Sequence, residues 1–492
     1  MSNGKLVRFL IISGLACGAG HMAAQQVGPE PITTYQPLPG PATQPNSTQF
    51  QGSVVQGQAS PTPIALTLED AIVRGLKSNL GLLVSTQADR ETQATRIRTL
   101  AALLPTVTAG ATTVEEQINL KTFGFSFQLP PSIPFSFPSI VGPFHYQEAN
   151  IFAKVPVLDL AQLRNYQATK ERSAAAQLNL KDARDLVVEA VSNAYLKIIS
   201  SAAQVVATEA DVATADTLYR RTADMKAVGV SPAIDVLRAQ VELKREQQIL
   251  VAEKNELEKD KLALSRVIGL PLGQQFTVSD PTPDVPVGEI NQEEALVRAY
   301  QHRSDYQAAA AAVRAAELAK RAAHSQWYPT VNVQGNYGDA GTNFGSSHGV
   351  FTVAGAVNFN VFDGHKIRAD ELQADTAVVN RRNDLENLRG QIEYQVRAAL
   401  LDLKSSAQQV DVAQSNVQLA QETLTQARDR FAAGVADNLE VVQAQQSVAD
   451  ANQNLISAHY QNNIARVELA RALGVAEEGI RNYFTMSGGP AH

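Results

Sequence analysis

The residue types that carry out catalysis or bind metals are scattered along this 492-residue sequence. Hydrolytic and zinc sites depend on fixed local arrangements, such as a His-Glu-x-x-His pair on a helix or a nucleophile elbow between a strand and a helix. No such arrangement is predicted, and the eight histidines lie at positions 21, 145, 302, 324, 348, 365, 459 and 492. No glycine-rich phosphate loop precedes a predicted helix. We therefore expect no enzyme, no metal site and no cofactor.

Acidic residues instead follow two predicted turns, each of which joins two long predicted helices. In chain order the residues of interest are Gly229, Val230, Ser231 and Asp235 at the first turn, and Gly434, Val435, Ala436, Glu440 and Gln443 at the second. Glycine readily takes the left-handed conformation that ends a helix. Ser231 followed by Pro232 is typical of a helix N-cap with proline at the first helical position.

Two interpretations of these turns are open. As plain structural features, they are turn and capping residues between helices. As functional features, both turns would lie at the same end of the molecule, and acids repeated around an oligomer would form a charged ring there.

The overall charge argues against nucleic acid as a partner. The chain has 42 Lys and Arg against 49 Asp and Glu, a net charge of -7, and the basic residues alternate with acids along predicted helices. The single cysteine, Cys17, excludes an internal disulfide and a cysteine-based metal site.

The N-terminal segment is typical of a secreted protein. Lys5 and Arg8 precede an apolar run, and small residues follow up to Ala24, so residues 1–24 are predicted to be a signal peptide. Cys17 resembles the cysteine of a lipoprotein cleavage box whose leucine is one place out of register, so lipidation of Cys17 is an alternative to ordinary cleavage near Ala24. Residues 25–65, rich in Pro and Gln, are predicted to be a disordered tail.

An internal duplication organises the rest of the chain. LTLEDAIVRGLKSN from Leu66 matches INQEEALVRAYQHR from Ile290, and GVSPAIDVLRAQ from Gly229 matches GVADNLEVVQAQ from Gly434. Further matched blocks keep the same order, which indicates two repeats, at residues 66–280 and 281–475, before a C-terminal tail at residues 476–492.

Each repeat is predicted to contain two strands between helices. Residues 160–228 lack Gly and Pro and predict one helix of about 100 Å, with a counterpart at about 364–433. Apolar residues recur every seven positions, which predicts coiled-coil packing. Shorter helices are expected at about 232–268 and 437–473, and strands at about 105–120, 145–158, 329–340 and 349–362.

The predicted strands alternate apolar and polar residues, with Lys154, Asn358 and Asn360 on the polar side. This pattern fits either a soluble sheet with one wet face or the apolar-out, polar-in strands of an outer-membrane barrel. Since the smallest known transmembrane barrels have about eight strands, four strands in one chain would enter a membrane only in an oligomer.

From Leu66 to Val475 the sequence resembles the TolC family of outer-membrane efflux and secretion channels. The resemblance rests on the duplication, on the helix ends at Pro105 and Pro329, on the strand-to-helix junctions and on the two turns. It implies a mainly α protein with membrane β structure, in which three chains form a 12-stranded β-barrel continuous with a 12-helix α-barrel. Such a homotrimer sits among outer-membrane lipids, has a long periplasmic extension and passes substrates outward.

The resemblance also implies partners and roles for the two turns. A periplasmic adaptor would contact the tips at residues 229–231, 434 and 435, and would connect the duct to an inner-membrane pump of the RND or ABC type. Asp235 and Glu440 fall at the Asp positions of the family's tip motif, which carries the periplasmic aperture. Gln443 replaces a second aperture acid, and Ala436 replaces an Arg that holds the best-known member closed. The resemblance therefore implies a weaker acidic ring and a different closing contact.

A periplasmic adaptor or coiled-coil scaffold that never enters the outer membrane is the main alternative. An adaptor would have one long hairpin flanked by compact β domains, whereas this sequence predicts two hairpins and four strands.

Overall fold

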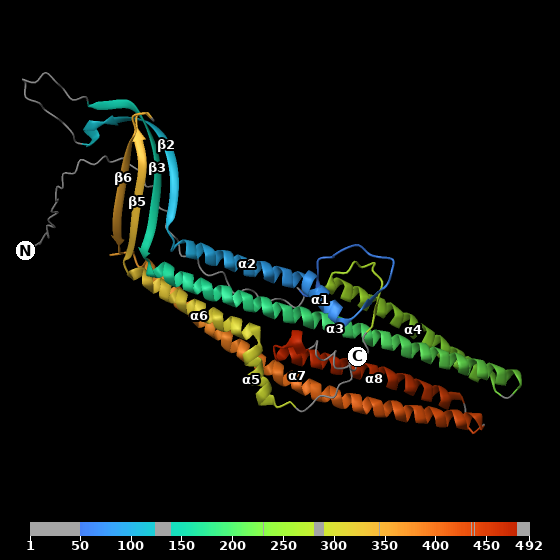
Figure 1. Cartoon of the computed structure of the whole chain (residues 1–492). Helices are drawn as coiled ribbons and strands as arrows, with labels where there is room; N and C mark the ends of the chain where they lie inside the picture. The colour runs from blue at the N-terminus through green and yellow to red at the C-terminus, as the bar shows by residue number, and fades with distance from the viewer. Residues whose placement is uncertain are drawn as a thin grey trace, which may run out of the picture. The chain divides into compact units, whose positions relative to one another are not determined.

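The computed structural model describes residues 50–123, 139–229, 231–279, 290–343, 345–433, 435–436 and 438–479. The predicted signal peptide with Cys17, and the tip residues Val230 and Gly434, lie outside these residues. The described chain is mainly helical, with one four-stranded sheet (Figure 1).

The same succession of elements occurs twice along the chain. The first comprises α1 (Leu68–Ser78), α2 (Leu80–Ala101), β2 (Thr106–Asn119), β3 (Ile140–Leu158), α3 (Leu160–Ala227) and α4 (Ala233–Ile268). The second comprises α5 (Gln292–His302), α6 (Ser304–His324), β5 (Thr330–Gly341), β6 (His348–Asn358), α7 (Lys366–Ala432) and α8 (Asn438–Ala472). Two short strands, β1 (Ile64–Leu66) and β4 (Phe276–Val278), pair in parallel.

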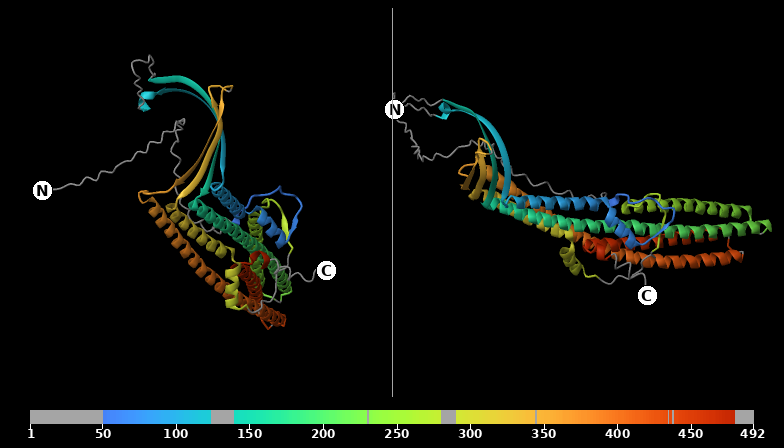
Figure 2. Two further views of the ribbon diagram at one scale, coloured as in Figure 1. Left: turned by 60° about the vertical axis from the view of Figure 1, so that its left-hand side comes forward. Right: turned by 45° about the horizontal axis from the view of Figure 1, so that its top comes forward.

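The long helices α3 and α7 have 68 and 67 residues, and they form because almost no helix breaker interrupts them. Helix α3 packs along α2, α4, α6 and α8, and α7 packs along α6 and α8 (Figure 2). The shorter α2 and α4 therefore succeed one another along α3. Helix α3 contains an 18-residue stretch of mean hydropathy 1.2, but half of that stretch is buried within the protein, as expected of a packed coiled-coil helix.

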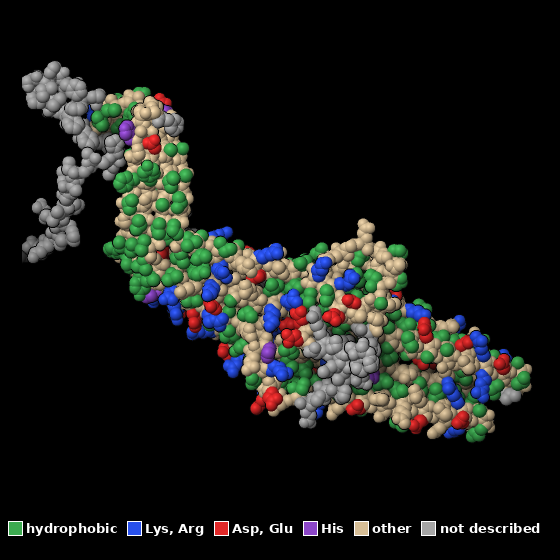
Figure 3. Space-filling view, in the orientation of Figure 1, with side chains coloured by type: hydrophobic (Ala, Val, Ile, Leu, Met, Phe, Trp, Pro, Cys, Tyr) green, Lys and Arg blue, Asp and Glu red, His purple; other side chains and the backbone are tan. Residues whose placement is uncertain are grey.

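The four-stranded sheet is antiparallel in the order β2-β3-β5-β6, with β2 and β6 at its edges. Its register places polar Thr106, Lys154 and Gln334 on one face, while Val107, Ala153 and Val353 lie on the other. The apolar face is exposed, and hydrophobic side chains cover much of the sheet surface in Figure 3. A soluble protein rarely leaves such a face uncovered.

Strand β6 is shorter than the sequence predicts. It ends at Asn358, because β5 begins at Thr330 and offers no partner beyond that residue. Asn358 shares the polar face with Lys154, as predicted, but Asn360 lies past the end of the strand and is not a strand residue.

Part of the expected disordered tail is packed. Phe50 is buried against Gly81, and Val54 donates a backbone hydrogen bond to the carbonyl of Ser78. An aromatic side chain and backbone pairing thus dock residues 50–66 onto the first group of helices. At the other end, Ala476 of the predicted C-terminal tail is also buried.

The largest core surrounds the middle of α3, where the phenolic oxygen of Tyr195 donates to the carbonyl of Leu66 over 2.9 Å. Nearby, Arg471 of α8 forms a buried ion pair of 2.7 Å with Asp182 of α3 and lies 3.7 Å from Glu189. Burial raises the pKa of Asp182 despite the attraction of Arg471. This charged contact joins the α3–α4 hairpin to the α7–α8 hairpin.

Candidate functional site at the two hairpin tips

The turn between α3 and α4 is called tip 1 (residues 228–238), and the turn between α7 and α8 is called tip 2 (residues 430–443). An apolar cluster from all four helices packs beside both tips: Leu218, Ala239, Leu424, Ala427, Phe431, Val441, Val442 and Ala444. Because of this cluster, the two tips lie at the same end of the helical layer (Figure 1).

At tip 1 the backbone turns at Gly229, whose φ of 78° lies in the left-handed region that glycine adopts without strain. The predicted N-cap at Ser231 is wrong. Helix α4 begins at Ala233, with Pro232 in extended conformation at the cap and no capping side chain. The hydroxyl of Ser231 instead donates to the carboxylate of Asp235 over 3.1 Å, since that carboxylate is within reach one helical turn away.

Asp235 is almost completely buried, with 10% of its side chain exposed. Besides the bond from Ser231, its carboxylate lies 3.6 Å from the guanidinium of Arg238. Its position in the first turn of α4 also favours a negative charge through the helix dipole. Asp235 therefore stabilises the turn, and it does not present a free charge at the end of the molecule.

The side chain of Asn438 connects the two tips directly. The amide of Asn438, at the start of α8, is fully buried and donates to the backbone carbonyl of Asp235 over 3.1 Å. Further along the same two helices, Gln446 donates to the carboxylate of Glu242 over 3.0 Å. The polar contacts between α4 and α8 thus fix the relative position of the hairpins at this end.

Tip 2 carries an ion pair across its turn. Arg430 Nη1 on α7 lies 3.5 Å from Glu440 Oε1 on α8, and these side chains are 58% and 40% exposed. The carbonyl of Arg430 also accepts hydrogen bonds from the amides of Val435 and Ala436. Arg430 therefore closes the turn through its backbone and reaches Glu440 through its side chain.

Sequence reasoning missed Arg430, although a signal was present. In an antiparallel helical hairpin, residues equally distant from the centre of the turn face each other, and Arg430 and Glu440 lie five residues on either side of Val435. The exposed Gln443 lies one turn further along α8, and Ala436 contributes only its backbone to the turn.

Several carboxylate side chains lie further along the helices from tip 1, where α4 packs against α3 and α8. Burial and, to a smaller extent, the negative charge of Glu246 raise the pKa of Asp211 on α3 to about 6. Burial also raises the pKa of Glu242, although the hydrogen bond from Gln446 and the charge of Arg245 oppose the shift. Both carboxyl groups therefore hold their protons to a higher pH than in the unfolded chain.

Among the described residues, no group of three or more His, Cys, Asp or Glu side chains could hold a metal ion. The letters GSSHG at residues 345–349 match the written pattern of a nucleophile elbow. They form the end of the β5–β6 turn and the first two residues of β6 and do not precede a helix, so the arrangement lacks the context that the motif requires.

The tips, the packed helices and the two-faced sheet are the arrangement that the sequence resemblance implied, and a family comparison decides the matter. The model of the outer membrane efflux protein family matches residues 72–270 and 295–475. The chain belongs to the outer membrane efflux protein family. Membership confirms the predicted family and the outer-membrane location with a periplasmic extension, and the family comprises channels and not enzymes.

Named relatives agree with this assignment. The antibiotic efflux pump outer membrane protein ArpC of Pseudomonas putida is 24% identical over 96% of this chain and 95% of its own length. The cation efflux system protein CusC of Escherichia coli is 22% identical over 66% of this chain and 71% of its own.

Solved structures of family members show the same fold. The Campylobacter jejuni CmeC outer membrane channel matches with a TM-score of 0.71 at 16% identity, covering 89% of this chain and 95% of that one. The outer membrane protein VceC of Vibrio cholerae matches with a TM-score of 0.70 at 16% identity, covering 83% and 96%.

Proposed function

We propose that this protein is the outer-membrane exit duct of a tripartite efflux system. The observation that carries the proposal is the sheet, whose exposed apolar face and polar opposite face continue directly into the long helices. Strands β2, β3, β5 and β6 contain 14, 19, 12 and 11 residues, which satisfies the ~9–11 residues needed to cross a bilayer.

The two free edges of the sheet support a homotrimer. Strands β2 and β6 each leave one edge without a partner in the described chain, and unpaired edges are unstable within a membrane. Three copies joined β6 to β2 would close a barrel of twelve strands, with Lys154 and Asn358 facing its lumen. The helices α2, α3, α6 and α7 would continue as an α-barrel in the periplasm.

The tips support a periplasmic aperture controlled chiefly by tip 2. The exposed Glu440 would contribute one acid per protomer to a ring, and Arg430 would provide the closing contact that Ala436 lacks. Gly229, Ser231 and Val435 lie at the end that a periplasmic adaptor would contact, and the adaptor would link the duct to an inner-membrane pump.

Efflux is favoured over protein secretion because ArpC and CusC are both named as efflux components. The adaptor or scaffold alternative is disfavoured because four strands present an exposed apolar face and because the family is one of outer-membrane proteins.

The test combines location, assembly and conductance. The protein should appear in the outer-membrane fraction as a detergent-stable trimer, and the purified trimer should form discrete channels in a planar bilayer. A soluble monomer that forms no channels would refute the proposal. A membrane-bound trimer without conductance would agree with the outer-membrane location but would refute the proposal that the protein is a duct.

A further inference from the structure

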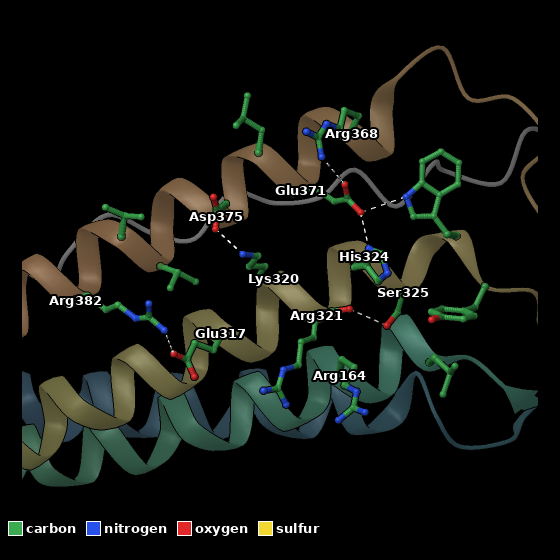
Figure 4. A pocket seen from close by; sticks show the side chains of 16 residues that line it. Arg164, Glu317, Lys320, Arg321, His324, Ser325, Arg368, Glu371, Asp375 and Arg382 are labelled. Atoms are coloured by element: carbon green, nitrogen blue, oxygen red, sulfur yellow. Dashed lines mark hydrogen bonds and ion pairs between the residues drawn. The ribbon is translucent and has the colours of Figure 1, made fainter.

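A cavity of about 1070 Å³ lies between α6, α7 and the first turn of α3 (Figure 4). Three of its acidic side chains are already paired with basic ones across the gap between α6 and α7. Glu317 accepts from Arg382, and Asp375 accepts from Lys320, each over 2.6 Å. These pairs hold the two helices together at this level.

Glu371 is the third acid of the cavity and has the most partners. It lies 2.8 Å from His324 Nδ1 and 3.3 Å from Arg368, and it accepts a hydrogen bond of 3.2 Å from the indole of Trp327. The hydrogen bond from His324 and then that from Arg368 lower the pKa of Glu371, so it remains ionised. Its charge is thus already satisfied by its neighbours.

Two arginines that line the same cavity remain without a carboxylate. Arg164 on α3 donates to the neutral amide of Gln167 over 3.0 Å, and neither Arg164 nor Arg321 forms an ion pair within the described parts of the chain. Figure 4 shows both side chains directed away from α7, on the side of α3. Two guanidinium groups that line one cavity are suited to a phosphate, which they can bind through several charge-assisted hydrogen bonds.

The position of the cavity indicates where the phosphate comes from. All three lining helices join the sheet at this end: α3 follows β3, α6 leads into β5, and α7 follows β6. Large apolar side chains are exposed beside it, including Trp327, Tyr328, Phe359 and Phe362, the last of which is 84% exposed. Trp and Tyr concentrate at the boundary between acyl chains and headgroups, and basic residues gather beside anionic lipid.

We propose that this cavity binds the phosphate of an anionic phospholipid in the inner leaflet of the outer membrane, with Arg164 and Arg321 as its ligands. The inference rests on the proposed function, because it requires the sheet to span the membrane. Trp327 and Tyr328 lie against the upper part of the acyl chains. The lipid anchors the junction at a fixed depth, while the ion pairs between α6 and α7 keep the cavity open.

The test uses Trp327, which is the only tryptophan in the chain. The trimer is purified in detergent and titrated with phosphatidylglycerol whose acyl chains carry bromine near the headgroup, and quenching of Trp327 fluorescence is recorded. Brominated phosphatidylcholine and inorganic phosphate serve as the other two probes. We expect saturable quenching by phosphatidylglycerol at least tenfold tighter than by phosphatidylcholine, and no displacement by millimolar phosphate.

The double variant Arg164→Gln/Arg321→Gln should weaken phosphatidylglycerol binding at least tenfold. The control Arg220→Gln/Arg221→Gln removes the same charge from α3 near tip 1 and should leave binding unchanged. Arg321→Lys keeps the charge but removes the guanidinium group, so its affinity for phosphatidylglycerol should lie between that of the double variant and that of the control.

Equal quenching by the two lipids, displacement by free phosphate, or wild-type binding by the double variant would overturn the lipid site. Lipid binding is measured in detergent and therefore does not depend on insertion. If the protein binds no lipid but still inserts and conducts, the lipid site is refuted and the proposed function is not. Failure of insertion or conductance appears separately in fractionation and bilayer recordings.

Discussion

At tip 1 the carboxylate of Asp235 is buried and bonded to Ser231 and Arg238, whereas at tip 2 the matching Glu440 is partly exposed and paired with Arg430 across the turn. Both acids occupy the seventh position of matching turn sequences, GVSPAID from Gly229 and GVADNLE from Gly434. The difference teaches that matching acids can have different environments: one holds a turn from a buried position, and the other stays partly exposed in an ion pair. An equal role for both acids, as the tip motif implied, does not follow from the environments observed.

The largest expected effect concerns the buried ion pair of Arg471 and Asp182, which joins the two hairpins that carry the tips. Arg471→Ala leaves Asp182 buried without its partner, and breaking a buried ion pair in this way costs about 3–5 kcal/mol. Thermal unfolding of the trimer in detergent, followed by circular dichroism, should show a clear loss of stability. The partly exposed pair Arg184–Glu477 offers the control, because water screens its charges more and Arg184→Ala should therefore cost less than Arg471→Ala.

A smaller effect is expected where the tips touch. Asn438→Ala removes the second hydrogen bond to the carbonyl of Asp235, and the loss of a typical intramolecular hydrogen bond costs about 0.5–1.5 kcal/mol. Hydrogen–deuterium exchange should rise at both tips, because each loses its contact with the other. The exposed Asn416→Ala on α7 should change exchange at neither tip, and an increase at tip 2 alone would show that Asn438 does not couple them.

The smallest effect is a pH dependence of the α3–α4 hairpin near tip 1. The pKa of Asp211 is raised to about 6 in the folded protein, chiefly by burial and then by Glu246. The folded state therefore binds more protons than the unfolded state between about pH 4 and 6, and stability falls as pH rises through this interval. Exchange rates divided by the intrinsic rate of amide exchange at each pH should show greater protection of the α3–α4 hairpin at pH 5 than at pH 7.

Asp211→Asn should reduce the difference in protection between pH 5 and pH 7. Part of the difference should remain, because burial also raises the pKa of Glu242 and its titration changes stability in the same direction. Tip 2 provides the internal control within the same sample. A pH response of equal size at tip 2 would contradict the proposed asymmetry.

Much of the fold follows from local sequence features. The absence of Gly and Pro predicts a helix over residues 160–228, and α3 spans Leu160–Ala227. Alternation predicts the strands, yet it continues past Asn358, where β6 stops, because the length of a strand depends on its partner and not on its own pattern.

The chemistry of the tips was less predictable. The burial of Asp235 depends on the packing of α8 against α4, which involves residues about 200 positions away in the sequence. The resemblance to the family points to position 436, whereas the ion pair of this turn forms between Arg430 and Glu440. Symmetry about the turn would have identified it.

The central claim is that the pair at tip 2 restricts the periplasmic end of a channel, and a double-mutant cycle of single-channel conductance tests it most directly. Arg430→Ala and Glu440→Gln should each raise conductance severalfold, and the double variant should raise it no further, because either change removes the same contact. Asp235→Asn, at the matching acid of tip 1, should leave conductance near the wild-type value. Unchanged conductance in both single variants at tip 2, or a larger increase from Asp235→Asn, would contradict the account.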